Sequence, residues 1–316
     1  MAPGSVGEQG WPPQRRLWFW LLSKGAFSKP IFFVAAAVFF QTFVHTEQIQ
    51  IPIGNRVVTR DVPLSLGQAI TGLVIALLIA ALGAVIHIRE TRSLQRARDR
   101  NGLAILQAVL GECAPRYFLY LRPFFLTRRM DLANPKHRKL PTMVRFYSEG
   151  KTEDLETMLE RAVRKSGPLI ALGQPGEMIG AGRLAVPDEE WKSRFEVLAG
   201  RARCIFIVPS ERTGTRSEIA WLRDNGHLSK AVFIMPPKLI EKTEWRHGKL
   251  RRIRVDMESL WKQAAVGLAK EAIHLPSYSR SGLLFKLDEA GVIQATAEFG
   301  DGGELRAGLA KIAVDL

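Results

Sequence analysis

Two long stretches without a charged residue dominate the hydropathy pattern near the N-terminus. They cover residues 30–46 and 64–88. A helix needs about 20 apolar residues to cross a bilayer, so the second stretch is long enough to span it with some tilt. The first stretch is shorter, and a cleaved signal peptide or a buried core helix is the alternative for it. We expect residues 30–88 to form a two-helix transmembrane hairpin with a short external loop.

Lysine and arginine residues concentrate on the outer flanks of the two stretches, and this bias predicts the orientation. Residues 1–29 form a basic and aromatic N-terminal segment. Five arginines follow the second stretch: Arg89, Arg92, Arg96, Arg98 and Arg100. The connection between the stretches holds only Arg56 and Arg60. By the positive-inside rule, both termini are expected in the cytoplasm, in a multi-pass protein of a bacterial inner (plasma) membrane.

The segments on either side of the second stretch also show regular patterns. Residues 48–62 alternate apolar and polar positions around Gly54 and Asn55, which predicts a small β-hairpin. Residues 89–112 carry leucines at helical spacing. They are therefore expected to continue the second span as a helical stalk.

Residues 113–316 alternate short apolar runs with amphipathic segments, a pattern typical of βαβ units. The expected strands are residues 117–124, 168–172, 204–208 and 231–235, followed by a hairpin of 283–287 and 292–297. The expected helices are residues 152–165, 188–201, 215–224, 257–272 and 304–314. Continuous apolar runs indicate strands covered on both faces. We expect a cytoplasmic α/β domain with a mostly parallel, flavodoxin-like sheet and a basic insertion at residues 238–254.

The formal net charge of +14 narrows the choice of partner. Such an excess often indicates nucleic-acid binding. Here much of it lies beside the two apolar stretches, in residues 128–139 and in residues 246–254. Because the cytoplasmic leaflet is anionic, these positions favour contact with lipid headgroups. We expect a lipid bilayer with anionic headgroups as a partner, and no nucleic acid.

Cysteine and histidine usage gives no sign of a metal or of a disulfide framework. The chain has two cysteines and six histidines. No CxxC or HExxH spacing occurs among them. The sequence therefore predicts a reducing compartment, no metal site and no cofactor.

The residues most suggestive of a functional site follow the third expected strand. In open parallel sheets, ligands bind outside the carboxyl ends of the strands. Ser210, Gly214 and Thr215 lie there, at the expected start of a helix whose free N–H groups can hold an anion. Glu218, in the expected first turn, could accept a ribose hydroxyl or stabilise an oxocarbenium-like centre. The alternative is a capping box, in which Thr215 and Glu218 only complete the helix end.

Two further loops reach the same edge of the expected sheet. Gly176 and Arg183 belong to a Gly/Pro-rich segment that is either a plain turn or a phosphate-contacting loop with Arg183 as anion clamp. Arg122 ends the first strand, where it could bind phosphate bidentately or pair with Glu177 or Glu218. Arg122, Gly176 and Arg183 are therefore candidate ligand-binding residues.

The motif Gly214-Thr215-x-x-Glu218 after a strand resembles a loop of nucleoside 2-deoxyribosyltransferases. It is also similar to the Gly-Thr-x-x-Glu of phosphoribohydrolases that release cytokinin bases. Together with the YLRPF and GPLIALGQPGE segments, the strand–helix order resembles membrane-tethered bacterial TIR-like domains. In the two enzyme families, and in TIR domains, some of which cleave NAD, the glutamate acts at a ribose-to-base bond. The resemblance therefore implies a catalytic role for Glu218 and a nucleotide, nucleoside or NAD as ligand.

Three hypotheses follow from these patterns. The first is a membrane-anchored signalling or interaction module with a TIR-like, nucleotide-binding type of domain, acting through its stalk and as a homo-oligomer. The second is an enzyme that cleaves an N-glycosidic bond with Glu218. The third is a scaffold whose basic insertion grips lipids.

Overall fold

The computed structural model describes residues 47–53, 56–62, 66–111, 115–123, 130–133, 152–173, 180–239, 242–246, 249–253 and 255–312. The chain divides into two compact units, Met1–Leu94 and Gln95–Leu316. The first expected span, residues 30–46, lies outside the described residues, as does Gly176.

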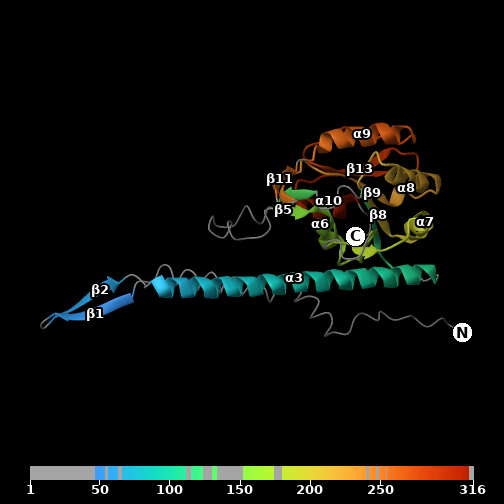
Figure 1. Ribbon diagram of the computed structural model, residues 1–316. Coiled ribbons are helices and arrows are strands. Elements are labelled where there is room, and N and C mark those ends of the chain that lie inside the picture. The colour runs from blue at the N-terminus through green and yellow to red at the C-terminus, as the bar shows by residue number, and fades with distance from the viewer. Residues whose placement is uncertain are drawn as a thin grey trace. The chain divides into compact units, whose positions relative to one another are not determined.

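The first unit contains the expected hairpin and most of the apolar helix (Figure 1). Strands β1 (Glu47–Ile53) and β2 (Arg56–Val62) pair antiparallel in an unbroken register, which confirms the predicted hairpin. The alternation of apolar and polar positions and the Gly-Asn dipeptide between the strands are sufficient local signals for this structure.

Helix α3 (Leu66–Leu110) runs for 45 residues from the second apolar stretch into the second unit. Its segment from Ile70 onward contains an 18-residue window with a mean hydropathy of 2.5, long and apolar enough to cross a membrane. Many apolar side chains of this segment are exposed, among them Leu77, Leu78 and Leu82. Among the described residues this is the one helix that qualifies, so the two-helix hairpin, the multi-pass topology and the orientation stay predictions.

The second unit is built on a seven-stranded sheet in the order β13-β12-β9-β8-β3-β6-β7. The five parallel strands are β3 (Phe118–Leu121), β6 (Leu169–Leu172), β7 (Gly182–Leu184), β8 (Cys204–Ile207) and β9 (Ala231–Met235). The antiparallel strands are β12 (Leu283–Leu287) and β13 (Ile293–Glu298). The predicted α/β class with a mostly parallel sheet is confirmed.

Helices cover both faces of this sheet, as the continuous apolar strands require. One face packs against α6 (Leu155–Val163) and α10 (Gly302–Ile312). The other packs against α7 (Trp191–Arg201), α8 (Thr213–Asp224), α9 (Met257–Ala269) and the last turns of α3. Alternate residues of β3 show the division: Phe118 and Tyr120 belong to the first layer, Leu119 and Leu121 to the second.

Several segments differ from the expected elements. Strand β5 (Thr152–Asp154) takes the expected first turn of a helix because it pairs with β4 (Asp131–Ala133), and Asp154 then caps α6. Helix α7 begins at Trp191, three residues after the expected start at residue 188. The basic insertion forms a hairpin of β10 (Lys242–Arg246) and β11 (Lys249–Ile253). A 3₁₀ turn, η2 (Leu228–Lys230), leads into β9.

The last turns of α3 lie unusually close to the edge strand β7. A Cβ on Gly182 would come within 2.5 Å of the Arg98 carbonyl oxygen, and a Cβ on Gly102 would meet the Leu184 side chain at 3.3 Å. At Gly182 only glycine permits this approach of helix and strand, because the added Cβ would meet backbone. The expected stalk is therefore, from Gln95 on, an integral part of the α/β unit.

We expect Gly182→Ala to lower the free energy of unfolding by about 1–3 kcal/mol, because the added methyl group meets backbone that must shift. Denaturant unfolding of the full chain in nanodiscs measures the loss. Gly214→Ala is the control, since a Cβ there has no heavy atom of the described structure within 4 Å. Equal stabilities of the two variants would contradict the close contact.

Candidate functional site

The chain order of the strands reverses between β3 and β8. From β3 the chain passes to β6 on one side, and it later returns to β8 on the other side. Such a reversal opens a crevice outside the carboxyl ends of the two strands, where ligands of open α/β sheets bind. The Val208 N–H donates to the Leu121 carbonyl at 3.0 Å and holds these ends together. Arg122 follows one strand and Ser210 follows the other.

The structure brings the two candidate arginines together on a third residue, Glu156 of α6. Its Oε2 accepts a hydrogen bond from Nη2 of Arg183 at 2.8 Å and lies 3.3 Å from Nε of Arg122. Its Oε1 accepts from the Ala181 N–H at 2.8 Å. Arg122, Glu156 and Arg183 are 8%, 2% and 1% exposed, so this is a buried ion-pair cluster.

Sequence reasoning missed Glu156, and it left open whether Arg122 binds a phosphate group or pairs with Glu177 or Glu218. Glu177 lies outside the described residues. The sequence contains a signal for Glu156, because Asp154 and Glu156 are two acidic residues at the start of an amphipathic helix. Two arginines at the ends of buried strands require such a counter-charge.

The hydroxyl of Tyr120 adds a neutral polar group to the cluster. Burial, followed by the charge of Glu156, raises the pKa of this phenol well above its ordinary value. Among the described residues, no hydrogen-bond partner reaches its Oη atom. Buried hydroxyls are normally hydrogen-bonded, so this unbonded one is an uncommon feature of the cluster.

Helix α3 binds the same region through polar side chains. Gln95 donates to the Ala181 carbonyl at 3.0 Å and accepts from the Gly180 N–H at 3.1 Å. Asp99 accepts from the Arg183 N–H at 2.8 Å, and Arg98 donates to the Gly180 carbonyl at 2.9 Å. Residues Gly180–Arg183 are therefore held between α3 on one side and Glu156 on the other.

The predicted capping box is wrong. Helix α8 begins at Thr213 and its N-cap is Arg212, which makes no side-chain cap hydrogen bond. Thr215 is consequently the third residue of the helix, and Glu218 lies in the second turn rather than the first. The turn before the helix is closed by Ser210, whose Oγ accepts from the Arg212 N–H at 3.1 Å.

Glu218 is a buried carboxyl group without a counter-charge. It is 7% exposed, and among the described residues no hydrogen bond or ion pair of its side chain occurs. Burial raises its pKa to about 8, so the group is protonated near neutral pH. Arg122 and Arg183 bind Glu156 instead, and they do not contribute to this shift. The structure does not bring them together with Glu218.

The remaining candidates lie around the start of α8. Gly214 is exposed in its first turn, whereas Thr215 is buried on the same face as Glu218. Arg122 and Ser210 thus follow the ends of β3 and β8, whereas Thr215 and Glu218 are buried on α8. Among the described residues, no group of three or more His, Cys, Asp or Glu side chains gathers to hold a metal ion.

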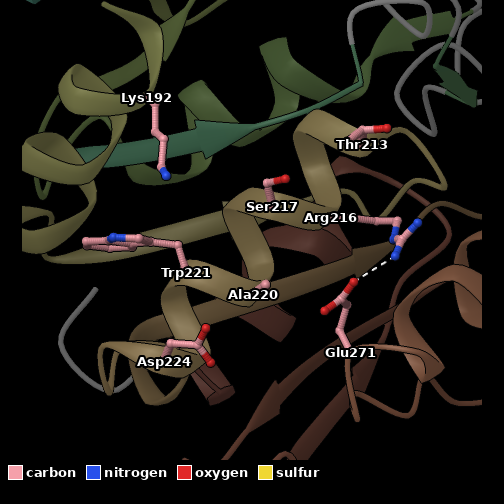
Figure 2. Close-up of a pocket in the computed structure, with 8 residues that line it drawn as sticks. All are labelled: Lys192, Thr213, Arg216, Ser217, Ala220, Trp221, Asp224 and Glu271. Atoms are coloured by element: carbon pink, nitrogen blue, oxygen red, sulfur yellow. Dashed lines mark hydrogen bonds and ion pairs between the residues drawn. The ribbon is translucent and has the colours of Figure 1, made fainter.

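A groove of about 340 Å³ lies on the other face of α8. It is lined by Lys192, Thr213, Arg216, Ser217, Ala220, Trp221, Asp224 and Glu271 (Figure 2). Arg216 donates to Glu271 at 2.7 Å, which joins α8 to the segment after α9. Glu218 does not line this groove, because residues 215, 218, 219 and 222 face the core.

Comparison with known proteins finds no match: no family model, no curated protein and no solved structure matches the chain. Fold and site together define an α/β domain on a long apolar helix, with a buried ion-pair cluster at the carboxyl edge of its sheet.

Proposed function

We propose that the chain is a membrane-anchored signalling module whose TIR-like α/β domain binds a nucleotide-class ligand at the carboxyl edge of the sheet. The observation that carries the proposal is the polar contact between α3 and residues Gly180–Arg183. The helix that reaches the membrane is thereby bonded to the strand that presents Arg183.

A chain of direct contacts connects the candidate ligand site to this helix. Arg122 stands at the strand reversal and contacts Glu156, which holds Arg183. The backbone of Arg183 donates to Asp99 of α3. An anion that attracts Arg122 or Arg183 competes with Glu156, and the resulting shift of β7 acts on α3. Arginine pairs suit this role because they bind phosphate groups bidentately.

The strand order supports a doubly wound fold of this kind. Without the three-residue edge strand β7, the parallel strands read β6-β3-β8-β9, which is 2-1-3-4 in chain order. Flavodoxin-like sheets have this order and bind phosphate-bearing ligands at the strand reversal. The ligand class expected here is therefore a nucleotide such as NAD.

A second candidate, cleavage of an N-glycosidic bond, is favoured by the state of Glu218. Its carboxyl group is protonated at neutral pH and is not consumed by helix capping. A buried neutral carboxyl group can donate a proton to a departing base. In this mechanism Glu218 acts as the general acid, and Ser210 and Thr215 orient the ribose.

One experiment separates the two candidates. The full chain in nanodiscs is incubated with NAD, ATP and a nucleoside panel, and amide hydrogen exchange is recorded while released base is quantified. We expect a ligand to slow exchange several-fold in residues 118–123, 180–184 and the part of α3 after Gln95. Asp99→Ala is expected to remove the effect on α3 alone, and Glu190→Ala, at an exposed ion pair, is the matched control.

The outcomes are distinct. Slower exchange without base release supports the signalling module, and base release that Glu218→Gln abolishes supports the enzyme. Unchanged exchange and no released base with every ligand would refute both for the ligands tested. An identical response of α3 in Asp99→Ala would refute the proposed route to the membrane helix.

A further inference from the structure

The two outer edges of the seven-stranded sheet differ in how they are protected. Strand β7, at one edge, has three residues, and its Arg183 N–H donates to Asp99 of α3 at 2.8 Å. Strand β13, at the other edge, has six residues, and among the described strands only β12 pairs with it. Sheet edges are usually protected by short strands, a covering element, proline or lysine. Strand β13 contains neither proline nor lysine, and most of its residues are exposed.

The hydrogen-bond pattern of β13 shows which of its backbone groups face outward. The Phe299 N–H donates to the Gly282 carbonyl at 3.4 Å, in line with the register of the β12–β13 pair. In an antiparallel ladder, hydrogen-bonded and non-hydrogen-bonded residue pairs alternate. Ala297 therefore bonds to β12, whereas the N–H and C=O groups of Thr296 and Glu298 point away from the sheet. These groups are the ones that a further strand would bond.

The edge strand is held in place by the rest of the domain. The side chains of Ala295 and Ala297 pack on the layer that contains α10, and a Cβ on Gly308 of that helix would lie 3.2 Å from the Ala297 Cβ. The side chains of Thr296 and Glu298 are exposed. The edge is therefore formed before any partner arrives, and a strand that pairs with it orders little additional backbone.

A second copy of β13 is complementary to this edge. Two copies related by a two-fold axis at position 296 run antiparallel, and Thr296 then lies opposite Thr296 of the partner subunit. Threonine pairs of this kind are favourable. In the same register, Gln294 lies opposite the partner's Glu298, so that an amide N–H can donate to a carboxylate. Because Glu298 is the one charged residue of the strand, no like charges are opposed.

We infer that β13 is a homodimer interface, at which two copies of the chain pair antiparallel around Thr296 and join their sheets into one. Strands β12 and β9 separate this edge from the strand reversal between β3 and β8. The contact is therefore independent of the ligand site proposed above and leaves that site open in the dimer.

The test measures the mass of the full chain in detergent micelles by light scattering over a range of concentrations, together with amide exchange of residues 293–299. We expect a dimer, and slower exchange of this strand as the dimer forms. Thr296→Lys and Thr296→Glu each place like charges opposite one another at the axis. Each substitution is therefore expected to raise the dissociation constant about fivefold.

An equal mixture of the two variants should form a mixed dimer with at least the wild-type affinity, because opposite charges then meet at the axis. Val266→Lys adds the same charge at an exposed position of α9 and should dimerise like wild type. These variants change exposed side chains, so the fold of each copy should be retained.

Three results would overturn the inference. The first is a mixture that dimerises no better than either variant alone, or an equal weakening by Val266→Lys. The second is a dimer in which residues 293–299 exchange as fast as in the monomer, since the copies would then associate through another surface. The third is a wild type that stays monomeric at every concentration, which would leave the edge to an extended segment of another protein.

Discussion

Replacing Glu156 by glutamine is expected to lower the free energy of unfolding by about 3–5 kcal/mol, because removal of one partner leaves buried charge uncompensated. Glu156 contacts both Arg122 and Arg183 and also accepts the Ala181 N–H. Glutamine keeps the size of the side chain but not its charge. Denaturant unfolding of the full chain, followed by the signal of the α/β unit, measures the loss.

Glu190→Gln provides a matched control for this substitution. Glu190 also pairs with an arginine, at 2.9 Å, but its side chain is 51% exposed. Exposed pairs contribute about 0–1 kcal/mol, so this variant should lose far less stability. If both variants lost equal amounts, the buried cluster would not hold the domain together. A double-mutant cycle with Arg183→Met would then measure the coupling directly.

Glu218→Gln is expected to raise the free energy of unfolding, by an amount that depends on pH. The carboxyl pKa is about 8 in the folded protein against an ordinary value of 4.5. The folded state therefore binds more protons between these values, and stability falls as pH rises through that window. At 1.36 kcal/mol per pKa unit, ionisation of Glu218 costs roughly 4–5 kcal/mol above pH 8. Glutamine stays neutral and avoids this cost.

The measurement is the difference in unfolding free energy between wild type and Glu218→Gln at several pH values from 4 to 9. The two proteins should be nearly equal at the acid end, with the variant more stable at the alkaline end. Glu211→Gln changes an exposed carboxyl group just before α8 and should show no such trend. Destabilisation of Glu218→Gln at every pH would mean that the carboxylate makes a stabilising bond in the folded protein.

This result also decides how a catalytic assay is interpreted. A Glu218→Gln protein that is folded and at least as stable as wild type loses base release only if the carboxyl group takes part in the chemistry. The Glu218→Gln variant thus separates a catalytic role of this carboxyl group from a structural one.

The elements that depend on local patterns were predicted well. The apolar stretch of α3, the β1–β2 hairpin and strands β9 and β12 follow from hydrophobic periodicity and turn residues within short windows. Helix starts were less predictable. Ser210 and Thr215 both offer a hydroxyl to a helix end, and the path of the chain after β8 selected the turn at Ser210.

Local sequence patterns do not predict which of the charged residues pair with one another. Strand β7 has three residues and no periodicity, and it forms because β6 pairs with it and α3 covers it. Only that placement brings Arg183 to Glu156, 27 residues earlier in the chain.

By itself, the sequence determined the apolar helix and the α/β class, because both arise from repeating contacts between near neighbours. The tertiary structure alone decided which carboxylate pairs with Arg122 and Arg183, and that Glu218 is buried without a counter-charge among the described residues. The physical reason is that the cost of burying a charge depends on the groups that surround it in space. Those groups come from α3, α6 and β7, and their meeting depends on the strand order of the whole sheet.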